Sequence, residues 1–137
     1  MAKNTTGGCL CGTVRFAYDG PIGTAAYCHC TDCRRCTGSA FNVSIAFEAA
    51  HFKIIAGAPK AYTKHADSGH ELTRHFCADC GSPISTSSPK HPDRLYVKAG
   101  SLDDPTIIKP TYQSWTGSSV AWAAIDPELI SYEKGRN

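Results

Sequence analysis

The residues of this 137-residue sequence whose types and spacing could do chemistry are its eight cysteines. Thiolates a few residues apart are well placed to bind one metal ion, whereas a disulfide needs Cα atoms about 4.4–6.8 Å apart with converging side chains. We therefore predict metal sites, with zinc as the metal, over disulfides or free structural thiols. The cysteines form a C-x-C pair, a C-x-C-x-x-C triplet, a C-x-x-C pair and a single residue: Cys9 and Cys11; Cys28, Cys30 and Cys33; Cys77 and Cys80; and Cys36.

The two cysteine pairs together offer four ligands to one ion. Cys77 and Cys80 are followed by Gly81, and glycine permits the positive φ that a zinc-knuckle turn often needs. Cys9 and Cys11 would complete a closed four-thiolate site. Such a site has no room for a substrate and stabilises the fold instead.

The triplet of Cys28, Cys30 and Cys33 offers three ligands. Three protein ligands with an open fourth position are typical of a reactive zinc. In the alternative interpretation, Cys36 fills the fourth position and makes this site inert too. His29 stands between two of the ligands, where its ring is expected to point away from the metal.

The elements that must position these cysteines are predicted to be mostly strands. Apolar and polar residues alternate along residues 13–18, 42–47 and 94–99, which is the pattern of a strand with one buried face. Glycine and proline at short intervals separate further strand candidates and leave few windows for a helix; the best such window, 120–130, is cut by Pro127. The sequence thus predicts small antiparallel sheets. The further strand candidates are residues 51–56, 61–64, 71–76 and 84–87.

Length and composition predict one globular domain over residues 1–137. Hydrophobic residues make up 42% and charged residues 19%, which excludes wholesale disorder. No apolar run approaches the roughly 20 residues of a membrane helix. The N-terminal stretch lacks the apolar segment of a secretory signal, so we expect a cytoplasmic protein. A formal charge of +2 is too small to indicate nucleic-acid binding, and the oligomeric state is left open.

The cysteine groups and their neighbours resemble the glutathione-dependent formaldehyde-activating enzyme family, which also includes centromere protein V. The resemblance implies a zinc-binding β fold called a β-tent, with two zinc ions per chain. It implies a structural zinc on Cys9, Cys11, Cys77 and Cys80, and a catalytic zinc on Cys28, Cys30 and Cys33; Cys36 is not part of the family pattern. The resembling segments are residues 8–12 (GCLCG), 28–35 (CHCTDCRR) and 76–83 (FCADCGSP).

The resemblance also implies a function, namely a carbon–sulfur lyase or synthase that adds a small-molecule thiol such as glutathione to formaldehyde, giving S-hydroxymethylglutathione. A fourth thiolate on a three-thiolate zinc gives a centre of formal charge −2, so we expect the metal to position and deprotonate the thiol more than to polarise the carbonyl. Arg34 and Arg35 could offset this charge or bind a substrate carboxylate, or be solvated surface charges.

Two other functions are compatible with the same cysteines. One is a non-catalytic zinc module that binds a partner protein, and the other is a thiol or zinc redox sensor that uses Cys36. Tyr112, Trp115 and Trp122 are interpreted either as core residues or as the lining of a pocket.

Overall fold

A computed structural model describes residues 4–65, 69–123 and 125–136, so the first three residues of the N-terminal stretch lie outside the described chain. As the sequence predicts, the described residues are mostly β, with one short α-helix. The strands are β1 (Thr5–Gly8), β2 (Arg15–Tyr18), β3 (Ala25–Cys28), β4 (Asn42–Glu48), β5 (Phe52–Ala56), β6 (Lys60–His65), β7 (Glu71–Phe76), β8 (Pro83–Ser87), β9 (Arg94–Lys98), β10 (Pro110–Ser114) and β11 (Ile130–Ser131). The helix is α1 (Thr31–Thr37), and 3-10 turns cover η1 (Ala49–His51), η2 (Ala99–Ser101), η3 (Pro105–Ile107) and η4 (Thr116–Ser118).

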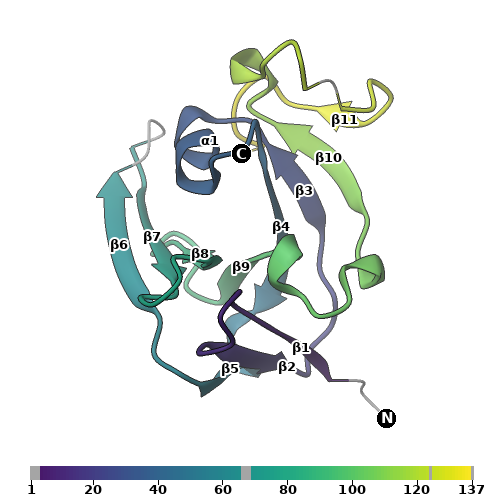
Figure 1. Cartoon of the computed structure of the whole chain (residues 1–137). Helices are drawn as coiled ribbons and strands as arrows, with labels where there is room; N and C mark the ends of the chain where they lie inside the picture. The colour runs from purple at the N-terminus through teal and green to yellow at the C-terminus, as the bar shows by residue number, and fades with distance from the viewer. Residues whose placement is uncertain (1–3, 66–68, 124, 137) are drawn as a thin grey trace.

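The strands form two sheets. One has three strands in the order β1-β2-β5, and the other has eight in the order β11-β10-β3-β4-β9-β8-β7-β6. In Figure 1 the larger sheet opens into two arms, with β6 and β7 on one side and β3 and β10 on the other, and α1 lies between the arms. The three-stranded sheet lies at the opposite end of the molecule from α1. This arrangement leaves the inner face of the larger sheet directed toward the space below the helix.

Apolar side chains from both sheets form the core. Phe16 and Tyr18 of the small sheet are fully buried, as are Ile45 and Phe47 of β4. The rings of Tyr18 and Phe47 stack with their centroids 3.8 Å apart. These are apolar positions of the alternating patterns, so the alternation identifies correctly which face of β2 and of β4 contributes to the apolar core.

All seven strand candidates are present, with ends within two residues of their predicted positions. Four further strands were not predicted: β1, β3, β10 and β11. Strand β10 pairs parallel with both β3 and β11, an addition to the expected antiparallel pairing. In the described part of the window 120–130 the chain forms turns up to Ile130, where β11 begins.

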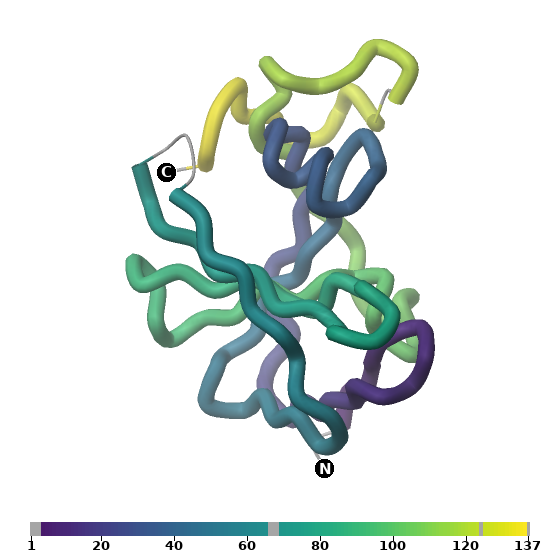
Figure 2. The backbone as a smooth tube through the Cα atoms, turned by 60° about the vertical axis from the view of Figure 1, so that its left-hand side comes forward, coloured from purple at the N-terminus to yellow at the C-terminus, as the bar shows by residue number. Residues whose placement is uncertain are grey.

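The chain brings the loop after β1 beside the loop between β7 and β8. Figure 2 shows these two loops next to each other although about 70 residues separate them in sequence. The Leu10 backbone N–H donates a hydrogen bond to Ser82 Oγ across this contact, at 3.0 Å. The two cysteine pairs lie on these two loops.

Candidate functional site

The two cysteine pairs come together in one cluster. The sulfurs of Cys9, Cys11, Cys77 and Cys80 all lie within 4.8 Å of one another. The Sγ atoms of Cys9 and Cys11 are 3.6 Å apart, and those of Cys11 and Cys77 are 3.8 Å apart. Four sulfurs bound tetrahedrally about 2.3 Å from one ion are about 3.8 Å apart, so the cluster fits zinc.

Backbone and hydroxyl donors support negative charge on these sulfurs. The Val14 backbone N–H donates to Cys9 Sγ at 3.2 Å and lowers the pKa of that thiol. The hydroxyl and N–H of Ser82 lower the pKa of Cys80 to about 5. Gly81 adopts the left-handed conformation expected of the knuckle turn, with φ +80°. The loops therefore favour the thiolate form that a metal ion requires at Cys9 and Cys80, whereas burial and the neighbouring sulfurs raise the pKa of Cys77 to about 11.

The triplet forms a second cluster at the junction of β3 and α1. Cys28 ends β3, Cys30 is the N-cap residue of α1, and Cys33 lies in the first turn of the helix. Their sulfurs also lie within 4.8 Å of one another. Cys30 Sγ accepts a hydrogen bond from the Cys33 N–H at 3.2 Å, so one thiol caps the helix that carries the other. We call Cys28, Cys30 and Cys33 the trio.

The trio concentrates negative charge on Cys28. Hydrogen bonds from the Cys30 and Cys33 thiols, the Cys30 N–H and the Ser114 hydroxyl lower the pKa of Cys28 to about 3. The same interactions with Cys28 raise the pKa of Cys30 and Cys33. Three soft sulfur donors with S–S distances suited to one ion fit zinc as well as the first cluster does.

Several residues near the trio are not part of it. Cys36 is exposed one helical turn after Cys33, and its thiol donates to the Cys33 carbonyl at 3.5 Å, so it does not occupy the position of a fourth ligand. His29 is buried with Nε2 2.9 Å from Gln113 Oε1. Arg34 and Arg35 do not line the cavity that is described in the next paragraph. Their positions therefore do not support a role in binding substrate.

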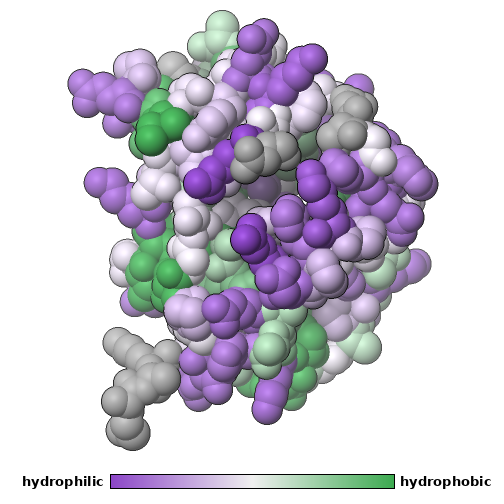
Figure 3. Space-filling model, turned by 180° about the vertical axis from the view of Figure 1, so that it is seen from behind, coloured by the Kyte–Doolittle hydropathy of each residue, from purple (hydrophilic) through white to green (hydrophobic). Residues whose placement is uncertain are grey.

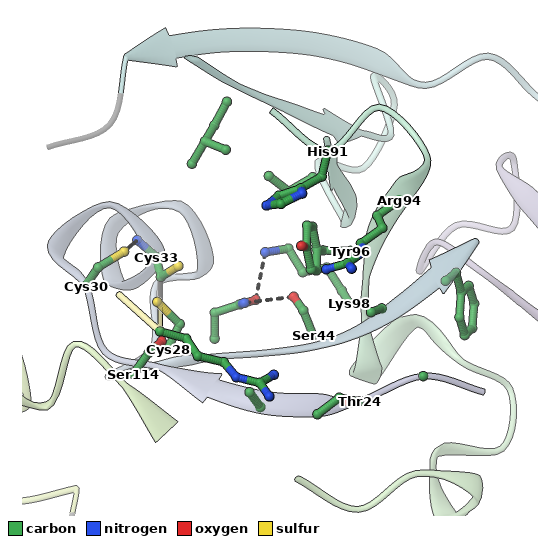
Figure 4. A pocket seen from close by; sticks show the side chains of 18 of the residues that line it. Thr24, Cys28, Cys30, Cys33, Ser44, His91, Arg94, Tyr96, Lys98 and Ser114 are labelled. Carbon is green, nitrogen blue, oxygen red and sulfur yellow. Dashed lines mark hydrogen bonds between the residues drawn. The ribbon is translucent and has the colours of Figure 1, made fainter. Parts of the chain in front are cut away.

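The trio opens onto a cavity of about 900 Å³ on the inner face of the large sheet. Figure 4 shows Cys28, Cys30 and Cys33 on one side of this cavity, across from the side chains of β9. The surface seen in Figure 3 is hollowed near its upper centre, where hydrophilic side chains form most of the rim. The volume is within the range of small-molecule binding sites.

The cavity is lined by the polar faces of the alternating strands. In β4 the cavity-facing residues include Asn42, Ser44 and Glu48, and in β9 they are Arg94, Tyr96 and Lys98. Register places Asn42 opposite Cys28, Ser44 opposite Lys98, and Glu48 opposite Arg94. The polar positions of these strands therefore face the cavity. This lining was not predicted, although the alternation marked its residues as polar. The polar and charged residues of β4 and β9 that line the cavity are Asn42, Ser44, Glu48, Arg94, Tyr96 and Lys98.

The cavity has an excess of cationic side chains. Its two acidic residues are already engaged, since Asp32 accepts from Lys64 Nζ at 2.6 Å and Glu48 lies 3.6 Å from His51. Within the described residues, none of the five lining cations has an ion pair with a carboxylate. The arrangement is therefore suited to an anionic ligand. The five cations are Arg74, Lys90, Arg94, Lys98 and Arg136.

The three aromatic candidates have different positions. Tyr112 and Trp115 line the cavity, and the guanidinium of Arg136 lies 4.6 Å from the centroid of the Tyr112 ring. Trp122 is 80% exposed, so both interpretations of that residue, as core or as pocket lining, are wrong.

A family comparison identifies the class of protein to which these clusters belong. Residues 4–118 match the sequence model of the glutathione-dependent formaldehyde-activating enzyme family. The chain belongs to this family. The match includes both cysteine clusters, so the family and the geometry agree on which cysteines form groups.

The fold is also similar to that of a solved structure. A crystal structure of a Rhodobacter sphaeroides protein, determined as a structural genomics target, superposes with a TM-score of 0.59 and 16% sequence identity. The alignment covers 93% of this chain and 98% of the other. This likeness supports the fold alone. Across the ranges 4–65, 69–123 and 125–136, no helix has the length and apolar character needed to span a membrane.

Proposed function

We propose that the trio and its cavity catalyse the joining of a small-molecule thiol, with glutathione as the first candidate, to formaldehyde, and the reverse cleavage of the adduct. The reaction classifies the protein as a carbon–sulfur lyase or synthase. The observation that carries the proposal is the cavity, because the trio faces a space whose cations form no ion pair with a carboxylate among the residues that the structure describes. Glutathione carries two carboxylates, which such cations would bind.

The chain supplies the ligands of the reactive metal. Cys28, Cys30 and Cys33 would hold a zinc ion with three thiolates, while Ser114 donates a hydrogen bond to the Cys28 sulfur. A zinc ion bound here would deprotonate an incoming thiol and keep it as a reactive thiolate. The exposed cations Lys90 and Arg94, which line the cavity, would hold the carboxylates of the thiol, so that its sulfur is directed toward the trio.

The reaction balances without an oxidant or reductant. The thiol releases its proton, its sulfur forms a bond with the formaldehyde carbon, and the carbonyl π electrons move to oxygen, which takes up a proton. The product is the S-hydroxymethyl thiol. Cleavage follows the same steps in reverse, so one site serves both directions.

The other cluster is proposed to be structural. Cys9, Cys11, Cys77 and Cys80 would hold a second zinc ion with four thiolates, which leaves no position for substrate. All eight cysteines are free thiols in the structure. This supports a reducing compartment such as the cytoplasm as the location of the protein.

Exchange spectroscopy by proton NMR tests the reaction directly. In a mixture of glutathione and formaldehyde, the zinc-loaded protein is expected to accelerate exchange between free glutathione and its S-hydroxymethyl adduct. The Cys30→Ser variant, which removes one ligand of the trio, is expected to lose the acceleration. Exchange at the uncatalysed rate with both zinc ions bound would rule out the glutathione reaction.

A second candidate function is a thiol redox sensor, and one observation favours it. Cys36 is exposed and lies one helical turn from Cys33, in a C-x-x-C spacing on α1. Oxidation of this pair to a disulfide would remove a ligand from the trio and release its metal. Zinc release by peroxide that is abolished in Cys36→Ser would support the sensor.

A further inference from the structure

Lys98 is a buried cation whose role the cysteine chemistry does not explain. It ends β9 with only 8% of its surface exposed. Its Nζ donates a hydrogen bond to Asn42 Oδ1 at 2.7 Å, and Asn42 Nδ2 donates to Ser44 Oγ at 2.8 Å. No carboxylate pairs with Lys98 anywhere in the part of the chain that the structure describes. Burying a cation beside neutral partners is costly, which points to a negative charge that it meets in function.

The sheet register places this ammonium group beside the trio. Asn42 lies directly opposite Cys28 on the neighbouring strand, and such Cα atoms are about 4.5–5.5 Å apart. Because Lys98 Nζ bonds the side chain of Asn42, it is held next to the residue that adjoins Cys28. Figure 4 shows Lys98 reaching from β9 toward the side of the cavity that holds the cysteines.

The other cations of the cavity are placed for a different task. Arg94 precedes Lys98 by four residues on β9, which corresponds to about 13 Å along the strand. Lys90 lies in the loop before that strand, and its Nζ contacts His70 Nε2 at 3.4 Å. These groups are exposed, whereas Lys98 is held in place and largely desolvated. A fixed, desolvated donor is the kind of group that stabilises charge developing during a reaction.

We infer that Lys98 contacts the carbonyl oxygen of the aldehyde and donates a proton to it as the carbon–sulfur bond forms. This inference rests on the proposed function. The sulfur–carbon bond forms, the carbonyl π bond breaks, and the oxygen receives its proton from Lys98 Nζ. The proton that the thiol released passes to water, and water returns one proton to Lys98. Atoms and charge therefore balance. The cleavage direction follows the same steps in reverse: Lys98 gives a proton to water, and the hydroxyl proton of the adduct passes to Lys98 Nζ as the carbon–sulfur bond breaks.

Two measurements on the zinc-loaded protein separate this role from carboxylate binding. The first is the exchange rate at saturating glutathione, and the second is the dissociation constant of glutathione alone, measured by calorimetry without aldehyde. Lys98→Met is expected to lower the exchange rate about 100-fold. The glutathione dissociation constant should stay within about twofold, because the inferred contact is made with the aldehyde oxygen alone. Lys98→Arg, which retains the charge, should recover part of the rate.

Matched variants keep the test decisive. Lys53→Met removes an exposed lysine from β5, outside the cavity, and should leave both measurements unchanged. If Lys98→Met binds fewer than two zinc ions, Lys98→Gln replaces it, because glutamine retains an N–H donor for Asn42 without the charge.

Three results would overturn the inference. A full exchange rate in a folded Lys98→Met or Lys98→Gln protein would make Lys98 a structural residue. A parallel loss of rate and glutathione affinity would make it a carboxylate anchor. A wild-type protein that does not accelerate exchange would remove the proposed function and this inference with it.

Discussion

At the scale of single residues, the charges that matter are placed by short, specific contacts. Backbone and hydroxyl hydrogen bonds favour the thiolate form of Cys28 and Cys80, and in the described ranges no cavity cation forms an ion pair with the two acidic residues of the lining. Arg15 and Asp103 show the opposite arrangement outside the cavity. The guanidinium donates to Asp103 Oδ1 at 2.9 Å, and Thr6 Oγ1 donates to Oδ2 at 2.6 Å. These contacts fasten the small sheet to the segment after η2.

The Arg15–Asp103 pair predicts a pH-dependent contribution to stability. Hydrogen bonds from Arg15 and Thr6 lower the pKa of Asp103 to about 2, below the value of about 3.9 in an unfolded chain. The contribution is therefore complete above about pH 4 and is lost as the pH falls toward 2. Both side chains are more than one third exposed, so Asp103→Asn should cost only about 0.5–1 kcal/mol of unfolding free energy at pH 7.

Urea unfolding at a series of pH values measures this contribution. Asp93→Asn is the matched control, since Asp93 is exposed and its carboxylate has no hydrogen bond or ion pair within the described ranges. The difference between the two variants should be constant from pH 5 to 8 and should shrink as the pH falls from about 4 toward 2. A difference that grows with acidity would contradict the assignment.

At the scale of elements, α1 positions the trio although it has only seven residues. It begins at the Cys30 cap and ends at Gly38, which adopts φ +71° and donates its N–H to the Arg34 carbonyl. In isolation a helix this short is unstable. Its caps and the sulfurs at its start therefore maintain the spacing between Cys30 and Cys33.

Gly38→Ala tests the dependence of the trio on the end of this helix. An alanine Cβ meets no atom within 4 Å, but the left-handed conformation is strained for alanine. The variant should lose about 1 kcal/mol of unfolding free energy. It should also bind the zinc ion of the trio more weakly, as measured by competition with a chromophoric chelator. Ser39→Ala is the control next to it. Equal zinc affinity in the two variants would show that the end of α1 does not influence the trio.

The sequence predicts the elements with strong alternation and misses those without it. Residues 94–99 alternate cleanly, and β9 was predicted for that reason. Strand β3 consists of Ala-Ala-Tyr-Cys and β10 contains a buried Gln113, so neither shows a period of two. Helix α1 is too short for a helical period to be visible. These missed elements depend on tertiary pairing that local sequence does not encode.

The same distinction applies to the site. The cysteine spacing predicts both clusters because the ligands within each group lie on one short segment. Lys98 and Asn42 are 56 residues apart and meet only through the pairing of β4 with β9. Alternation marked both as polar positions on strands with one buried face. It could not show that their polar face encloses a cavity.

At the scale of the whole molecule, the first cluster joins distant parts of the chain. Cys9 and Cys11 lie between β1 and β2 of the small sheet, and Cys77 and Cys80 lie between β7 and β8 of the large sheet. The apparent free energy of zinc binding at a structural site is about 10–16 kcal/mol, which is comparable to the total stability of a domain. A metal bound there would therefore decide whether the two sheets stay together.

Loss of one ligand from each cluster should have different consequences. Cys80→Ser should abolish the cooperative thermal transition, because the four-cysteine metal site that joins the two sheets is lost. Cys30→Ser should remain folded, with about one zinc ion per chain by elemental analysis, since the trio connects only β3 with α1. Circular dichroism during heating distinguishes the two. If Cys30→Ser unfolds and Cys80→Ser does not, the trio is the structural site and the four-cysteine cluster is not.

Zinc K-edge X-ray absorption tests most directly whether the trio leaves a place for an external thiol on its metal ion. Protein with two zinc ions should show about 3.5 sulfur neighbours per zinc, because seven cysteines serve two ions. Addition of glutathione should raise this number to about 4. Four sulfurs per zinc before glutathione is added, or no change after its addition, would contradict the account.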